Sequence, residues 1–354
     1  MFQISTWLRL AFGAFALTCS GCTTLSGATN TVIAGDSLVL AGTAPGNLCL
    51  ADVVRDTVTV RNTYEPDQPH TVLYEEGVDY TIDYGKGAIA RTPDSRIPDF
   101  STNMLYGQKD FDHNQFTGFG NAAHFVFADY VSRTGFSFAQ PVAQPALLPK
   151  TLAKLQAGGP FKLLAYGDSI TAGGDASARH LQFQEHYARH LAALFPKAMI
   201  EVENGATGGD STVQGLARLE EKVLTRSPDL VLVGFGMNDH NINSVPVDQF
   251  EENLVTIVTR IRETTGAEAI LYSAFPPNDD WKYGSHRMEA YAAATQRAAE
   301  RLQCAFADVY GLWMRVLERK DPPSLLGNNI NHPNDFGHWL YFQALTSVPL
   351  DMPR

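Results

Sequence analysis

The stretch that decides the fold is YGDSITAG at residues 166–173, which directly follows the apolar run FKLLA at residues 161–165. A short apolar run that ends at glycine and aspartate is typical of a buried strand that meets a loop. The sequence therefore predicts that Ser169 lies at the carboxyl end of a strand, the edge where open α/β sheets bind their ligands. A helix that begins nearby would direct backbone N–H groups toward charge that develops beside this serine. Taken alone, Gly-Asp-Ser also fits an ordinary turn, because turns favour all three residue types.

Strand and helix patterns alternate on the C-terminal side of this stretch. Short, mostly apolar runs at residues 199–202, 230–233, 269–272 and 304–309 predict four further strands, and segments with apolar residues at helical spacing separate them. Strands that alternate with helices form parallel sheets covered on both faces. The sequence therefore predicts a three-layer α/β/α domain with a five-stranded parallel sheet over residues 151–354.

A different pattern precedes this domain. Polar and apolar residues alternate within residues 30–138, as in DTVTVR at residues 56–61, and turn residues recur about every eight positions. This pattern predicts a small all-β domain of the sandwich or jelly-roll type. Its many aromatic residues fit either the core of that domain or an exposed platform on which sugar rings stack. Residues 139–150 contain three prolines and indicate a semi-rigid linker.

The first 21 residues indicate a targeting segment. Arg9 precedes an apolar stretch at residues 10–17 that is too short to span a bilayer and is typical of the core of a signal peptide. Ser-Gly-Cys at residues 20–22 resembles the end of a bacterial lipobox, in which Cys22 is lipidated, although Cys19 stands where that motif usually has leucine. We therefore expect a periplasmic or cell-surface lipoprotein, with ordinary secretion as the alternative.

Composition narrows the possible functions. The 354-residue chain has a formal net charge of −11 and no basic run, which argues against nucleic acid as a partner. Hydrophobic residues make up 44% of the chain and charged residues 18%, as in globular proteins. Beyond the targeting segment and Cys22 only Cys49 and Cys304 remain. Because they fall in different predicted domains, we expect two free, buried thiols.

Three more loops at the predicted sheet edge carry residues suited to catalysis. They are NGATGGDS at residues 204–211, GFGMND at residues 234–239 and NHPN at residues 331–334. Together they offer glycine amides, a side-chain amide and an imidazole close to the hydroxyl of Ser169. These groups are the parts of an acyl-transfer site.

With these four blocks in this order, the sequence resembles the SGNH, or GDSL-type, hydrolases over about residues 160–347. The resemblance implies that Ser169 is the nucleophile and that His332 is the general base. It further implies that the N–H groups of Ser169 and Gly209 and the side-chain amide of Asn238 form the oxyanion hole. No metal ion or other cofactor is implied.

Asn329 departs from the pattern of this family, which has an aspartate three residues before the histidine. An asparagine Oδ1 accepts a hydrogen bond from the imidazole Nδ1–H but supplies no negative charge. Asn329 is therefore a doubtful third member of the site. A Ser–His dyad oriented by a backbone carbonyl is equally compatible with the sequence, and Asp335 is a further substitute. Asp168 and Asp239 are predicted to fix their loops through hydrogen bonds.

The sequence thus predicts a serine esterase that removes acetyl groups from a carbohydrate. An envelope location, a glycine-rich open loop and an additional β domain suit a polymeric, acylated carbohydrate as the partner, and membrane contact is expected only through a lipid at Cys22. A lipase, arylesterase or thioesterase of the same family is the alternative, although no run of apolar loop residues indicates a long acyl channel. A non-catalytic glycan-binding lipoprotein is a third hypothesis. Asn329 is the only residue in its favour, and the other residues of the site argue against it.

Overall fold

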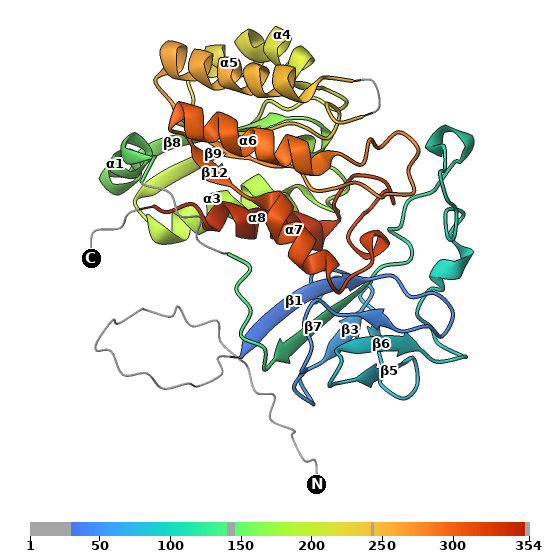
Figure 1. The fold of residues 1–354 in the computed structure, drawn as a ribbon. Coiled ribbons are helices and arrows are strands. Elements are labelled where there is room, and N and C mark those ends of the chain that lie inside the picture. The colour runs from blue at the N-terminus through green and yellow to red at the C-terminus, as the bar shows by residue number, and fades with distance from the viewer. Residues whose placement is uncertain (1–29, 140–145, 242–243, 351–354) are drawn as a thin grey trace.

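The computed structural model describes residues 30–139, 146–241 and 244–350 of the chain. An α/β unit forms the C-terminal part, and antiparallel strands form the N-terminal part beneath it in Figure 1. The predicted signal segment, Cys22 and most of the predicted linker lie outside the described residues. In the described residues, no helix has the length and apolar character needed to cross a membrane.

The α/β unit is built on a five-stranded parallel sheet, as the sequence predicts. Its strands lie in the order β12-β11-β10-β8-β9. The direction of winding reverses between β8 and β10, and ligands of such sheets bind at the carboxyl ends of the strands beside this reversal. The strand bounds are Gly159–Gly167 for β8, Ala198–Asn204 for β9, Leu230–Gly234 for β10, Glu268–Tyr272 for β11 and Ala305–Ala307 for β12.

Helices cover both faces of this sheet and complete the three layers (Figure 1). Helices α4, α5 and α6 pack together in one layer, and α3 packs on α8, which also contacts α7, in the other. Each longer helix has one apolar face, which it buries against the sheet. The helix bounds are Pro149–Ala157 for α1, Ser169–Ala172 for α2, Phe183–Leu194 for α3, Thr212–Lys222 for α4, Val247–Thr265 for α5, Met288–Leu302 for α6, Val309–Leu317 for α7 and Asp335–Thr346 for α8. Short 3₁₀ turns are η1 at Phe100–Thr102, η2 at His113–Gln115, η3 at Arg179–Leu181, η4 at Leu224–Arg226 and η5 at Pro322–Ser324.

The N-terminal part consists of two antiparallel sheets. One has the order β1-β7-β3-β4 and the other the order β2-β6-β5. Residues 92–125, which connect β6 to β7, run alongside the α/β unit (Figure 1). The strand bounds are Thr31–Leu38 for β1, Gly46–Asn47 for β2, Thr59–Arg61 for β3, Leu73–Tyr74 for β4, Tyr80–Asp83 for β5, Ala88–Arg91 for β6 and Val126–Ser132 for β7.

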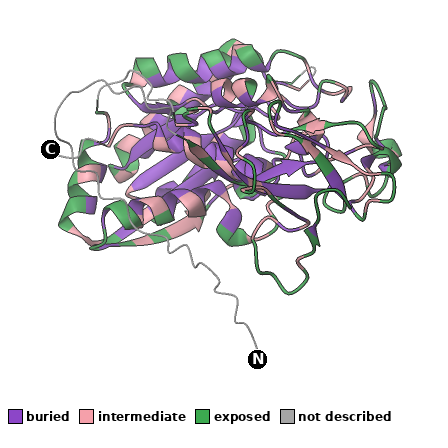
Figure 2. Ribbon diagram, turned by 90° about the horizontal axis from the view of Figure 1, so that it is seen from below, coloured by how far each residue is buried: buried purple, intermediate pink, exposed green. Residues whose placement is uncertain are grey.

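One hydrophobic core runs through both parts. Buried side chains from β1, such as Leu38, belong to the same packed cluster as Leu164 of β8 and Leu340 of α8. Strands β10, β11 and β12 of the parallel sheet are buried along their whole length, whereas the helices expose their outer faces (Figure 2). The aromatic residues of the N-terminal part mostly join its core, because Phe100, Phe111, Phe125, Phe127, Tyr130 and Phe138 are all buried. Cys49 and Cys304 are buried free thiols, which confirms the expectation from the sequence.

Candidate active site

Ser169 lies where strand β8 ends and the short helix α2 begins. Gly167 is the last residue of the strand. It must be glycine, because a Cβ at this position would lie only 2.2 Å from the carbonyl oxygen of Gly234 on the neighbouring strand. Asp168 caps the helix, and its Oδ1 accepts a hydrogen bond from the Ile170 N–H at 3.0 Å. The side chain of Ser169 is half-buried at the carboxyl edge of the sheet. Each residue of Gly-Asp-Ser thus has a separate structural reason to stand where it does.

His332 approaches this serine from the loop between η5 and α8. Its Nε2 lies 2.9 Å from the Oγ of Ser169, which is hydrogen-bond distance. Asn328 shapes the loop, since its Oδ1 accepts hydrogen bonds from the N–H groups of Ile330, Asn331 and His332 at 2.9–3.0 Å. Such a side-chain-to-backbone turn fixes the main chain that carries the imidazole.

The other imidazole nitrogen faces a carboxylate that sequence reasoning missed. The Oδ2 of Asp175 lies 3.6 Å from the Nδ1 of His332, and the two side chains are 38% and 25% exposed. Asp175 comes from the nucleophile loop, directly after Gly173 and Gly174. Gly174 has a φ of +47°, a left-handed conformation that favours glycine, and a Cβ there would lie only 3.3 Å from the Cδ of Pro333 in the loop of His332. No local sequence signal links this aspartate to the histidine, since the two residues lie far apart in the chain.

Helix α8 anchors the loop that carries Asp175 at two points. The Nε2–H of His338 donates to the carbonyl oxygen of Gly173 at 2.9 Å, and burial lowers the pKa of His338 to about 3, so its ring is neutral. At the other end of the loop, the N–H and the Oγ of Ser177 both donate to Asp335 at 2.7 Å. These two anchors hold residues 173–177 beside His332.

Asn329 and Asp335, the two partners considered for His332, make their hydrogen bonds elsewhere. The Oδ1 of Asn329 accepts from the Nδ2 of Asn121 at 3.4 Å, and its carbonyl oxygen accepts from Asn278 at 2.9 Å. Asn329 is buried and has a φ of 60°, a left-handed conformation that asparagine adopts more readily than most residues. Asp335 receives both hydrogen bonds from Ser177. The geometry therefore gives Asn329 a role in the turn, and the carboxylate that lies beside the Nδ1 of His332 is that of Asp175.

The three expected oxyanion-hole residues lie on loops that meet at this sheet edge. Ser169 is the first residue of α2, a position whose N–H has no carbonyl partner within the helix. Gly208, next to Gly209, lies beside the nucleophile, since a Cβ there would be in ordinary contact with the Cβ of Ser169 at 3.8 Å. Asn238 follows β10, and its Nδ2 donates to the carbonyl oxygen of Asp210 at 2.9 Å. This bond orients the amide and leaves its second N–H for another acceptor.

Two buried carboxylates support these loops. Asp239 accepts hydrogen bonds from the N–H groups of Thr212 and Gly236, while Asp168 caps α2. Burial raises the pKa of Asp239 to about 6 and that of Asp168 to about 7. Both side chains act as acceptors for backbone N–H groups, as the sequence predicts.

A hydroxyl within hydrogen-bond distance of an imidazole, with amide donors on adjacent loops, is the arrangement that acyl transfer requires. Within residues 30–139, 146–241 and 244–350, no group of three or more His, Cys, Asp or Glu side chains is arranged to hold a metal ion. The site therefore has the composition of a serine-type hydrolase.

Comparison with known proteins identifies the family. Residues 165–340 match the model of the GDSL-like Lipase/Acylhydrolase family, and this part of the chain belongs to that family. An arylesterase from Vibrio mimicus is 28% identical over 153 residues, which cover 42% of this chain and 72% of that enzyme. An acetylxylan esterase from Geobacillus stearothermophilus is 24% identical over 207 residues, which cover 54% of this chain and 94% of the relative. The protein is accordingly a carboxylic ester hydrolase, as the sequence predicts.

Solved structures give matches to the same part of the chain. A crystal structure of an acetylxylan esterase from Geobacillus stearothermophilus aligns with a TM-score of 0.47 at 25% identity. The alignment covers 55% of this chain and 97% of that structure. The family match begins at residue 165, so it does not include the two antiparallel sheets.

Proposed function

We propose that this protein is a carbohydrate esterase that hydrolyses O-acetyl groups with Ser169 as the nucleophile and His332 as the general base. The observation that carries the proposal is the 2.9 Å contact between the Oγ of Ser169 and the Nε2 of His332 at the carboxyl edge of β8. Similarity to an acetylxylan esterase along 94% of that enzyme's length supports acetylated carbohydrate as the substrate class.

The reaction proceeds in two steps. The Oγ of Ser169 attacks the ester carbonyl while His332 takes the hydroxyl proton, and the same proton passes to the oxygen of the leaving sugar as its bond to the acyl carbon breaks. The Ser169 N–H, the Gly209 N–H and the Asn238 amide stabilise the negative oxygen of the tetrahedral intermediate. Water then attacks the acyl carbon while His332 takes a proton from it, and as the bond between this carbon and the Oγ of Ser169 breaks, His332 passes that proton to the Oγ and acetate leaves.

Asp175 takes the place of the aspartate that the family has at position 329. A carboxylate beside the Nδ1 holds the ring in the tautomer that accepts a proton at Nε2, and it stabilises the imidazolium that forms. Although 3.6 Å exceeds a hydrogen bond, contacts of catalytic groups are often longer in the free enzyme than in the complex. Asp175 is thus a positioning residue that acts through His332.

The test is release of acetate from acetylated xylan and from p-nitrophenyl acetate by the wild type and by Ser169→Ala. The alanine variant should fold normally and lose activity on both substrates by several orders of magnitude, because the covalent step is lost. Activity close to the wild-type level would refute Ser169 as the nucleophile. An enzyme that cleaves p-nitrophenyl esters of long acyl chains much faster than acetate, and leaves acetylated xylan intact, would instead be a lipase or arylesterase.

We also propose export with lipidation at Cys22, on the motif at residues 20–22. Replacement of Cys22 by serine should move the protein from the membrane fraction to the soluble fraction. Equal fractionation of the two forms would leave ordinary secretion as the better explanation.

A further inference from the structure

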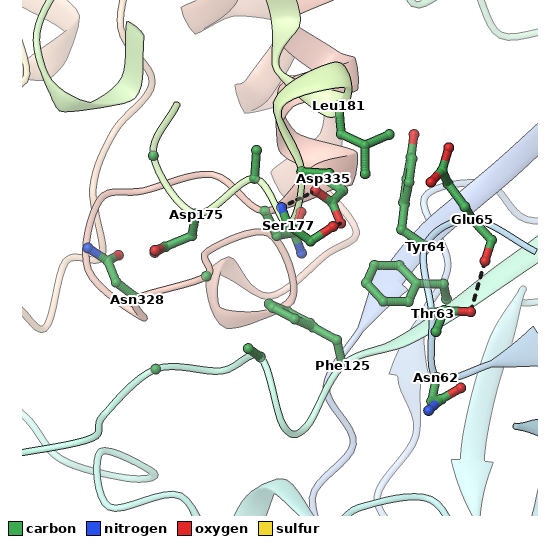
Figure 3. Close-up of a pocket in the computed structure, with 18 of the residues that line it drawn as sticks. Asn62, Thr63, Tyr64, Glu65, Phe125, Asp175, Ser177, Leu181, Asn328 and Asp335 are labelled. Carbon is green, nitrogen blue, oxygen red and sulfur yellow. Dashed lines mark hydrogen bonds between the residues drawn. The ribbon is translucent and has the colours of Figure 1, made fainter. Parts of the chain in front are cut away.

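A cleft of about 790 Å³ lies between the two parts of the molecule, close to the catalytic histidine. Tyr64, Glu65 and Phe125 line it from the N-terminal part, while Asp175 and Asn328 line it from the α/β unit (Figure 3). The imidazole of His180 lies 2.9 Å from the Oε1 of Glu65, so one contact at the cleft joins the two parts directly. Neither part forms this cleft alone.

The cleft is separated from the nucleophile by little more than one imidazole ring. Asp175 lines the cleft and lies 3.6 Å from the Nδ1 of His332, and the Nε2 of the same ring lies 2.9 Å from the Oγ of Ser169. Asn328 also lines the cleft, and its Oδ1 accepts the N–H of His332. Two residues of the cleft lining thus contact the catalytic histidine directly.

The walls combine aromatic rings with groups that bind hydroxyls. Phe125 points toward the hollow in Figure 3, and Tyr64 and Phe119, which are half-buried, belong to the same lining. Rings of this kind pack on the apolar faces of sugars. Carboxylates accept hydrogen bonds from hydroxyls, and side-chain amides both donate and accept. A ligand with apolar C–H faces and many hydroxyls can pack on the aromatic rings and form hydrogen bonds with the polar side chains.

The charge of the cleft restricts the ligand further. Glu65, Asp175 and Asp335 are in its lining together with His70 and His180, whereas no lysine or arginine occurs among the described residues that form it. Like charges placed in an interface cost binding free energy. Phosphorylated ligands and polymers of uronic acids are therefore disfavoured, and an uncharged carbohydrate is favoured.

We infer that this cleft binds neutral sugar units of the substrate polymer next to the unit that carries the acetyl group. The inference rests on the proposed carbohydrate esterase activity for the position of the ester, and it gives the N-terminal part a function as one wall of the substrate site. Binding of the polymer itself depends only on the cleft, so it can be measured separately from hydrolysis.

Ala122 provides a steric test. It lines the cleft and is exposed, so tryptophan at this position fills the cleft without removing a buried contact. Ala123 is also exposed but is not part of the lining, which makes Ala123→Trp the matched control. Both substitutions are made in the Ser169→Ala background, and calorimetry measures binding of unacetylated xylohexaose, mannohexaose and an oligogalacturonate.

The inference predicts that at least one of the two neutral oligosaccharides binds and that Ala122→Trp weakens this binding by about tenfold or more, whereas Ala123→Trp does not. The oligogalacturonate should not bind measurably. Absence of binding by both neutral oligosaccharides, equal binding in the two tryptophan variants, or tighter binding of the oligogalacturonate would overturn the inference.

Kinetics separates this inference from the proposed function. The measured quantity is kcat/KM for an acetylated xylo- or manno-oligosaccharide divided by kcat/KM for p-nitrophenyl acetate. With Ser169 intact, Ala122→Trp should lower this ratio by about tenfold, while Ala123→Trp keeps the wild-type ratio. An unchanged ratio in Ala122→Trp contradicts the cleft as a subsite but leaves the esterase function intact. If the wild type hydrolyses no acetylated carbohydrate although Ala122→Trp weakens sugar binding, the cleft is supported and the proposed function is wrong.

Discussion

At the scale of single residues, the contact between Asp175 and His332 decides whether the site is a dyad or a triad. We expect Asp175→Asn to lower kcat for p-nitrophenyl acetate by about 10- to 100-fold with little change in KM. This is less than for a fully buried carboxylate, because the pair is partly exposed and 3.6 Å apart. Asp175→Glu, which keeps a carboxylate beside the imidazole, should retain more of the activity than Asp175→Asn.

The control for Asp175 restores a carboxylate at the family's usual position. Adding Asn329→Asp to Asp175→Asn should not recover activity, because residue 329 has a left-handed backbone and directs its Oδ1 to Asn121. Recovery in the double variant would show that residue 329 reaches the imidazole. A wild-type rate in the single variant would mean that His332 is held by another group.

Asp168 makes a separate prediction about stability. Burial raises its pKa to about 7, whereas an aspartate in an unfolded chain titrates near a pH of about 3.9. The folded state therefore binds the proton more tightly, and the free energy of unfolding falls as the pH rises from about 4 to about 7. Asp168→Asn keeps an acceptor for the Ile170 N–H and remains uncharged. Its Tm should exceed that of the wild type at pH 8 and match it near pH 4, and parallel Tm curves would contradict the assignment.

At the scale of elements, local sequence blocks predict which loops carry the catalytic residues better than they predict the contacts that position those residues. An apolar run followed by glycines marks the end of a strand near Ser169. Because this pattern is local, the sequence predicts both the strand and its loop. The contacts of Asn329 and Asp175 join separate loops, and no periodicity or spacing encodes them. A glycine-rich segment such as residues 173–174 predicts only a loop, although here its glycines allow that loop to pack against the loop of His332.

The loop that carries His332 is supported by the N-terminal part. Asn121 is fully buried, and its Nδ2 donates to the carbonyl oxygen of Leu326 at 2.9 Å while its N–H donates to that of Gly327 at 2.6 Å. Asn121→Leu keeps a similar size but loses the amide, which leaves buried acceptors unpaired at a cost of about 1–3 kcal/mol. We expect a lower Tm together with a several-fold lower kcat for p-nitrophenyl acetate.

Asn114→Leu is the matched control, because Asn114 is exposed in the same segment and its side-chain amide donates hydrogen bonds to Asp112 and Tyr283, which lie outside the loop of His332. This variant should retain the wild-type Tm and kcat. A lower Tm without any loss of kcat in Asn121→Leu would mean that the support stabilises the fold but does not position His332.

At the scale of the whole molecule, the two parts predicted as domains share one hydrophobic core and a buried ion pair. Asp36 of β1 and Lys320, which follows α7, form an ion pair at 2.7 Å, and both side chains are fully buried. The Oδ2 of Asp36 also accepts the N–H of Cys49 and the hydroxyl of Tyr130. A sequence cannot reveal such a pair, since charged residues are mostly exposed and the two partners belong to different parts of the chain.

Lys320→Met should therefore be strongly destabilising. It leaves the Asp36 carboxylate buried without its cation, which costs about 3–5 kcal/mol in comparable pairs.

Because the ion pair and the shared core join the two parts, we expect the wild type to unfold in guanidinium chloride in a single transition, with near-UV and far-UV circular dichroism changing together. Lys320→Met should lower the midpoint, whereas Lys320→Met combined with Asp36→Asn should regain part of the loss, since the unpaired charge is then absent. Two separate transitions in the wild type would show that the two parts unfold independently. A double variant that is less stable than Lys320→Met would show that the Asp36 carboxylate stabilises the fold mainly through its hydrogen bonds with Cys49 and Tyr130.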